Sequence, residues 1–307
     1  MSAASQQSQR PRARGRGALA PALAALALLA AAAGVVFWSL SARQTLGQLE
    51  HEETSVYSTI RVRRDGDVRL LAFVRDDGRE LVQSRVDLTA PQTLASPYAR
   101  SMFAAYLYQP EPRRVLIVGL GGGAMVRFLA HHTPDVGVDA VEIDPVVVRL
   151  ADQYFGVRSG GNVRVVTADA VAFIESTEER YDVIFMDAFL RPSGDTDGTG
   201  VPTRLKTVEF LGRVKRALAP GGVVAFNINQ HAGVADDIAA VAEVFGQVAI
   251  YGAAPADNDV VIATDGAMPG DAVLTARIGA LDQRFRGALS FADILRRRRA
   301  AVAPSRP

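Results

Sequence analysis

The chain has 307 residues, a formal net charge of +1 at neutral pH and no cysteine. The near-neutral charge argues against a general nucleic-acid-binding surface. The lack of cysteine excludes disulfides, thiolate metal sites and cysteine nucleophiles. This length allows one domain of about 200 residues with an extension at each end.

The N-terminal segment predicts a membrane anchor. Residues 1–17 form a basic arm, and residues 18–40 carry no charged side chain. Such an apolar run is long enough to cross a hydrocarbon core of roughly 30 Å as one transmembrane helix. A cleaved signal peptide is the alternative, but the run is longer than the usual apolar region and Leu40–Ala42 is a poor cleavage site.

The next segments predict a linker and a small antiparallel sheet. Residues 41–54 are polar and are expected to form the linker, and residues 55–90 are expected to form a small β domain. Apolar and polar residues alternate there, and Asp65-Gly66 and Asp77-Gly78 are typical of hairpin turns. We therefore expect a β meander ahead of the main domain.

Residues 91–265 carry the pattern of an open parallel sheet, entered through a helical stretch near Tyr98 to Tyr108. Short apolar runs alternate with segments of helical periodicity. The predicted strands are 115–118, 138–143, 163–168, 181–186, 248–251 and 260–263, with a further strand after Pro220-Gly-Gly222. Repeated strand, crossover helix and strand require parallel pairing. We expect an α/β fold with a Rossmann-like, seven-stranded, mostly parallel sheet that has helices on both faces.

Residues 266–307 predict two helices and a basic tail. The arginine run at 296–299 is expected to continue a helix from about Phe291, because cations suit the C-terminal end of a helix dipole. A solvated helix face is the expected role of this run, and contact with anionic lipid is the alternative.

The ends of the predicted strands carry residues suited to a nucleoside. Four glycines follow the first strand: Gly119, Gly121, Gly122 and Gly123. Without Cβ atoms they allow a flat ligand to lie close to the backbone. Glu142 is placed to accept hydrogen bonds from ribose hydroxyls, and Asp169 could accept the adenine amino group. The turn alone also fits a G-x-G-x-x-A dinucleotide fingerprint, so a nicotinamide-dependent oxidoreductase stays open.

The full set of motifs resembles the spermidine synthase family, a branch of the class I S-adenosylmethionine-dependent transferases. The resemblance spans roughly residues 55–265 and rests on the glycine turn, Glu142-Ile-Asp-Pro145, Asp169-Ala170, the strand ending at Asp187 and the Pro-Gly-Gly hairpin. It implies that Glu142 holds the ribose, that Asp169 and Ala170 hold the adenine, and that Asp187 is catalytic. It also implies S-adenosylmethionine or its decarboxylated form as co-substrate, without a metal.

Two positions depart from the aminopropyltransferase pattern. Aminopropyltransferases resemble one another in an aspartate within the glycine run, and the matching position in this chain is Gly122. They also share a second aspartate, and the matching position here is Leu190, which is followed by Arg191. A polyamine channel needs several carboxylates, so the acceptor site is atypical. Asp195 and Asp197 could partly compensate.

The pattern is also similar to a divergent bacterial branch joined to membrane helices, and to a methyltransferase domain that modifies a translation elongation factor. Methyl and aminopropyl transfer to an amine acceptor, either a small molecule or a protein, therefore both stay open. A non-catalytic, membrane-tethered scaffold is a third hypothesis, motivated by Gly122 and Leu190. We expect a single-pass protein of the bacterial inner membrane that could form a homodimer. The arginine bias places its main domain outside, whereas the co-substrate favours the cytoplasm.

Several other residues have simpler expected roles. Asp144, before a proline, is expected to begin a helix. His131 and His132 are expected to be solvated surface residues without a metal role. The loop from Arg191 to Arg204 is rich in glycine and proline and leaves from Asp187, which favours a lid over the site.

Overall fold

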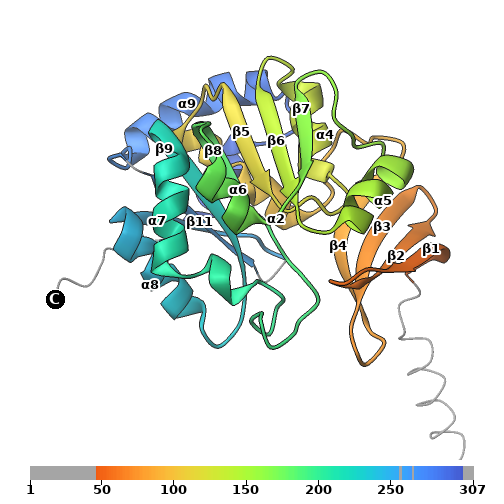
Figure 1. The fold of residues 1–307 in the computed structure, drawn as a ribbon. Coiled ribbons are helices and arrows are strands. Elements are labelled where there is room, and N and C mark those ends of the chain that lie inside the picture. Colours follow the sequence, from red (N-terminus) through yellow and green to blue (C-terminus); the bar gives the residue numbers. More distant parts are fainter. Residues whose placement is uncertain (1–45, 256–257, 265, 300–307) are drawn as a thin grey trace, which may run out of the picture. The chain divides into compact units, whose positions relative to one another are not determined.

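The computed structural model describes residues 46–255, 258–264 and 266–299 (Figure 1). These residues belong to one compact unit, Leu46–Pro307. The predicted basic arm and membrane anchor lie outside the described residues. Within the part of the chain that is described, no helix is long and apolar enough to cross a membrane. The anchor and its inner-membrane location stay predictions from the sequence.

A small antiparallel sheet precedes the main domain, as predicted. Its strands are neighbours in chain order: β1 (Gln48–Thr54), β2 (Thr59–Asp65), β3 (Val68–Val74) and β4 (Glu80–Asp87). Gly66 and Gly78 supply the two predicted hairpin turns with φ angles of 57° and 77°. Positive φ angles of this size favour glycine.

The prediction of a linker over residues 41–54 is wrong for its second half, which forms strand β1. This strand is polar, and it lies at the edge of the sheet beside β2. Glu52 forms an ion pair with Arg61 at 2.5 Å, and Glu50 forms one with Arg69 at 2.7 Å. Charged cross-strand partners therefore take the place of the apolar alternation that usually indicates a strand.

The main sheet has seven strands in the order β10-β11-β9-β8-β5-β6-β7. They are β5 (Arg114–Val118), β6 (Gly137–Glu142), β7 (Val163–Thr167), β8 (Tyr181–Met186), β9 (Leu218–Asn229), β10 (Val248–Gly252) and β11 (Asn258–Thr264). Five neighbouring strands from β9 to β7 pair in parallel, and β11 is antiparallel to both of its neighbours. The predicted Rossmann-like, mostly parallel sheet is confirmed.

Helices cover both faces of this sheet (Figure 1). One core packs the small sheet with α2 (Pro97–Met102), α3 (Ala105–Tyr108), α4 (Ala124–His132), α5 (Pro145–Phe155), α9 (Asp271–Arg284) and α10 (Phe291–Arg296). The other core packs α6 (Ala170–Ser176), α7 (Val208–Ala217) and α8 (Val234–Phe245). A short 3-10 turn, Thr203–Leu205, precedes α7. The carboxyl ends of the central strands stay free for a ligand.

The expected solvated position of His132 is wrong. Its ring is half-buried and lies 4.4 Å from the ring of Phe128, measured between centroids. Phe285, from the end of α9, also packs against it at 6.3 Å. The covering residue is distant in the sequence, so the local pattern around His132 did not indicate burial.

The expected helical arginine run is also wrong, because α10 ends at Arg296. Arg298 forms an isolated antiparallel bridge with Tyr251, and the backbone N–H of Arg299 donates to the carbonyl of Ile250 at 2.7 Å. The segment therefore supplies hydrogen-bond partners to β10, the edge strand of the main sheet. Edge strands need such cover because their outer backbone groups lack a neighbouring strand.

Candidate active site

A pocket lies at the carboxyl ends of β5, β6 and β8, with about 990 Å³ of empty space that includes open solvent at its mouth. Its lining includes the glycine turn after β5, Glu142 after β6 and Asp187 after β8. The small N-terminal sheet contributes Phe73 and Ser84 to another wall. The predicted strand-end residues therefore meet in one pocket, as expected for an open parallel sheet.

The glycine turn lines this pocket only through its first half. Gly119 and Gly121 are lining residues. Gly119 has a φ angle of 96°, and a Cβ atom there would lie 2.3 Å from the carbonyl oxygen of Asp187. Only glycine therefore lets the chain leave β5 beside the end of β8.

Gly122 and Gly123 pack against residues behind the turn, and their predicted contact with the ligand stays a prediction. A Cβ atom on Gly122 would lie 2.9 Å from Ser84 Oγ and 3.1 Å from the ring of Phe155. One on Gly123 would lie 2.6 Å from Val157. A larger side chain at Gly122 would have to displace these neighbours.

Glu142 fixes the glycine turn through hydrogen bonds to the backbone. Its Oε2 accepts the backbone N–H of Leu120 at 2.9 Å, and its Oε1 accepts that of Asp144 at 3.0 Å. Burial raises the pKa of Glu142, although these backbone hydrogen bonds oppose the shift. Each carboxylate oxygen can accept more than one hydrogen bond, so Glu142 can still bind the hydroxyls of a ligand.

Asp144 has the structural role that its position before a proline predicts. It is buried and caps α5, with its Oδ1 accepting the backbone N–H of Val146 at 2.9 Å. The side chain of Ser55 donates to its other oxygen.

Asp169 is engaged by protein groups on both oxygens. Its Oδ1 caps α6 by accepting the backbone N–H of Val171 at 2.7 Å, and its Oδ2 forms an ion pair with Arg204. Ala170 and Arg204 line the pocket. Arg204 was not among the sequence-predicted site residues, and it lies where the adenine end of a nucleoside is expected.

Asp187 has two neutral hydrogen-bond partners. Asn227 Nδ2 donates to its Oδ1 at 2.7 Å, and the hydroxyl of Tyr98 donates to its Oδ2 at 3.3 Å. Burial raises the pKa of Asp187 to about 7, and the two hydrogen bonds oppose this shift only in part. A carboxyl group with this pKa can exchange a proton near neutral pH.

Asn227 is a site residue that the sequence analysis missed. Asn258 Nδ2 donates to its Oδ1 at 2.8 Å, which turns the Asn227 amide nitrogen towards Asp187. The available signal was a polar residue inside the apolar strand β9, where Asn227 is 7% exposed. Buried polar side chains generally have a specific partner.

The loop after Asp187 covers part of the pocket through Leu190, Pro202 and Arg204. Arg191 points elsewhere, since it forms an ion pair with Asp76 in the turn between β3 and β4. The backbone N–H of Leu190 donates to the carbonyl of Gly200 at 2.8 Å. This position agrees with the lid prediction, and opening and closing stay a prediction.

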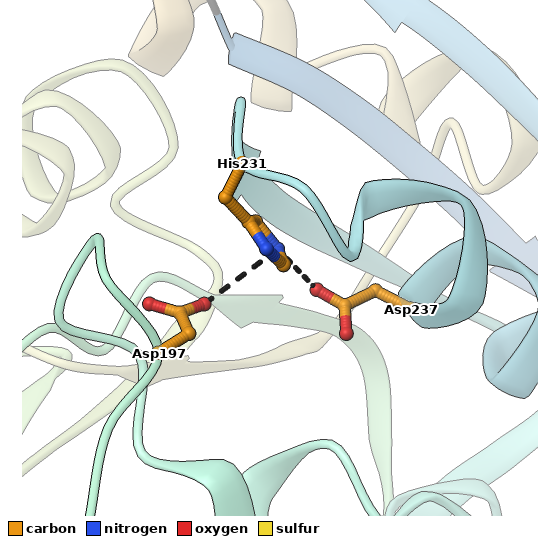
Figure 2. A group of neighbouring side chains, drawn as sticks. All are labelled: Asp197, His231 and Asp237. Atoms are coloured by element: carbon orange, nitrogen blue, oxygen red, sulfur yellow. Dashed lines mark hydrogen bonds and ion pairs between the residues drawn. The ribbon is translucent and has the colours of Figure 1, made fainter. Parts of the chain in front are cut away.

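A second acidic group lies beside the pocket and consists of Asp197, His231 and Asp237 (Figure 2). Their ligand atoms lie within 4.8 Å of one another, and such residue types can bind a metal ion. The ammonium of Lys206 already lies among them, 2.6 Å from Asp237 Oδ2 and in an ion pair with Asp197. The expectation that the chain uses no metal stays a prediction.

Asp197 is paired with Lys206 instead of facing the main pocket. Burial opposes ionisation of Asp197, but hydrogen bonds from Lys206 and Thr199 lower its pKa to about 2. Asp197 is absent from the residues that line the main pocket, and Asp195 is exposed. The suggested compensation by these two aspartates is therefore wrong for the geometry of this site.

Residues 99–254 match the spermine/spermidine synthase domain. The chain is 36% identical over 180 residues to a polyamine aminopropyltransferase of Vibrio vulnificus, and the match covers 58% of each protein. The chain thus spans less than two thirds of that curated relative.

Two solved structures share the fold. Human methyltransferase-like protein 13, in complex with SAH, matches with a TM-score of 0.57 and 25% identity, covering 62% of this chain and 93% of that one. A probable spermidine synthase from Corynebacterium glutamicum matches with a TM-score of 0.60 and 23% identity, covering 78% and 95%. These matches show a Rossmann-like class I methyltransferase fold.

Proposed function

Because the chain belongs to the spermine/spermidine synthase domain family, we propose that it transfers an alkyl group from an S-adenosylmethionine-type nucleoside to an amine. The observation that carries this proposal is Asp187, a carboxylate at the end of β8 with neutral partners and a pKa raised by burial to about 7. Such a group is suited to remove a proton at neutral pH.

The reaction is a substitution at a carbon bonded to the sulfonium of the donor. An ammonium has no lone pair, so the acceptor must first lose a proton, which Asp187 takes. The amine nitrogen then forms a bond to the carbon, and the carbon–sulfur bond breaks to leave a neutral thioether. Tyr98 and Asn227 hold the Asp187 carboxylate in place through hydrogen bonds. Alignment of donor and acceptor supplies much of the rate enhancement.

The other strand-end residues are proposed to hold the nucleoside. Glu142 would accept the ribose hydroxyls, Gly119 and Gly121 would let the donor lie against the backbone, and Ala170 would contact the adenine. All four line the pocket. Support comes from the related methyltransferase-like protein 13, which was solved in complex with SAH.

The transferred group is proposed to be either methyl or aminopropyl, because the relatives include polyamine aminopropyltransferases and an elongation-factor methyltransferase. Calorimetry with S-adenosylmethionine, its decarboxylated form and NAD tests the ligand class. One of the two sulfonium nucleosides should bind, and Glu142→Gln should weaken that binding by roughly 1 to 3 kcal/mol through lost charge-assisted hydrogen bonds. Asp195→Asn, at an exposed loop position, is the matched control.

Two outcomes would contradict the proposal in different ways. Binding of NAD alone would assign the chain to the oxidoreductases. Donor binding without any alkylated product, measured by mass spectrometry with lysate acceptors, would favour the non-catalytic scaffold.

A further inference from the structure

Only two carboxylates line the main pocket among the described residues, Glu142 and Asp187. Glu142 already accepts two backbone hydrogen bonds and lies on the proposed ribose side. Asp187 is therefore the one carboxylate left to face the acceptor. Arg204 is the one cationic residue of the lining in the part of the chain that the structure describes, and it is paired with Asp169.

Apolar residues make up a large part of the wall of the pocket that contains Asp187. Phe189 and Leu190 follow it in the chain and line the same pocket, together with Leu94 and Phe73. Such walls can bury the hydrocarbon part of an acceptor favourably. The polar residues of the lining, Gln83, Ser84, Ser96 and Tyr98, are neutral, so they offer hydrogen bonds but no counter-charge to a second ammonium.

The neighbouring carboxylates of Asp197 and Asp237 add no negative charge to the lining of the main pocket. Both oxygens of Asp197 are engaged, one by Lys206 and the other by Thr199 and the backbone N–H groups of Gly200 and Val201. Asp237 is paired with Lys206 at 2.6 Å. Neither carboxylate lines the main pocket.

From this arrangement we propose that the acceptor is a primary amine with one positive charge and an apolar body, rather than a diamine or a polyamine. The inference rests on the proposed function of Asp187 and names the class of acceptor for the same site. One ammonium meets Asp187 and gives up its proton, and a second ammonium would find no further carboxylate in the described lining to balance its charge.

The test compares two acceptors of nearly equal length and shape. Pentan-1-amine and butane-1,4-diamine differ by a terminal methyl group in place of a terminal ammonium. The full chain is first titrated with both sulfonium donors by calorimetry, and the donor that binds is then used at saturation. We expect kcat/KM for pentan-1-amine to exceed that for the diamine by about tenfold or more, since the second ammonium of the diamine is partly dehydrated in the pocket without a counter-charge.

Leu190 offers a matched pair of variants. In Leu190→Asp the new carboxylate should pair with the second ammonium, so the ratio of kcat/KM for pentan-1-amine to that for the diamine should fall by about tenfold or more. The uncharged Leu190→Asn should leave this ratio unchanged. The comparison of the two acceptors on the unaltered chain stands even if either variant fails to fold.

The outcomes separate the inference from the proposed function. If neither donor bound, the proposed function would fail and the acceptor class would fall with it. If a donor bound and the diamine were the better acceptor, or pentan-1-amine gave no product, only the acceptor class would be overturned.

Discussion

Two half-buried aspartates ten positions apart in the sequence, Asp187 and Asp197, have opposite acid strengths. The pKa of Asp187 is raised by burial to about 7, whereas that of Asp197 is lowered to about 2 despite burial. The difference lies in their partners. Asp187 accepts from the neutral Asn227 and Tyr98, and Asp197 pairs with the ammonium of Lys206.

This contrast separates a carboxylate that can react from one that holds structure. A buried carboxyl group without a cationic partner has a raised pKa, and its carboxylate is therefore a strong enough base to take a proton from an amine at neutral pH. A carboxylate fixed by a cation and backbone N–H groups has no such capacity, and Asp197 instead connects the loop to α8 through Lys206 and Asp237.

The largest expected effect is on turnover of Asp187→Asn. The amide keeps the shape of the side chain but cannot accept a proton, so turnover should fall by on the order of a hundredfold or more. Donor affinity should stay within about threefold, because Asp187 does not hold the nucleoside in the proposed arrangement. Single-turnover kinetics and calorimetry measure the two quantities. A loss of donor binding with normal turnover would reverse the roles of Asp187 and Glu142.

The second prediction concerns pH. The folded-state pKa of Asp187 is raised above its ordinary value of 3.8 to about 7, so its stabilising contribution is complete below about pH 4 and is lost as the pH rises through 7. Between about pH 5 and 8 the free energy of unfolding of the ligand-free chain should fall by roughly 2 to 3 kcal/mol relative to that of Asp187→Asn. Turnover should rise over the same range, because only the ionised carboxylate accepts a proton.

Urea unfolding of both proteins at several pH values measures this difference. Stability curves that stayed parallel from pH 5 to 8 would show that Asp187 is already ionised throughout, which would remove the contrast with Asp197.

The sequence predicted most of the main sheet because its strands are apolar runs that repeat with crossover helices. Strand β8 was predicted with the bounds that the structure has, and β5 was predicted one residue short. Strand β1 was missed because its stability comes from arginines on β2 and β3 that local periodicity does not reveal.

The site was predictable at the level of backbone position only. Parallel strands place their carboxyl ends together, so the meeting of Glu142 and Asp187 followed from topology. Their partners did not. Tyr98 and Arg204 line the pocket from other segments of the chain, and Asn227 donates to Asp187 from β9. The acid strengths of the aspartates depend on these partners, and they could not be assigned without the structure.

The third prediction tests the structural side of the contrast through Lys206→Met. The change leaves Asp197 and Asp237 close together without their shared cation, and their side chains are only 10% and 16% exposed. We expect a loss of roughly 1 to 2 kcal/mol in the free energy of unfolding, which is less than for a fully buried pair. Adding Asp197→Asn to Lys206→Met should recover part of the lost free energy of unfolding, because it removes one of the two repelling charges. Turnover that fell as far as in Asp187→Asn would place Lys206 in the chemistry and break the contrast.

The smallest expected effect is on donor affinity, and it concerns Asp169, whose cationic partner is exposed. The Arg204 and Asp169 side chains are 48% and 31% exposed, so their ion pair should contribute less than about 1 kcal/mol to stability. If Asp169 accepts the adenine amino group, Arg204 competes for the same oxygen, and Arg204→Gln should strengthen donor binding by about two- to fivefold. Arg158→Gln, which removes an exposed surface pair with Asp152, is the matched control and should leave donor affinity unchanged. Weaker donor binding in Arg204→Gln would instead mean that the guanidinium itself contacts the nucleoside, and the predicted adenine role of Asp169 would be wrong.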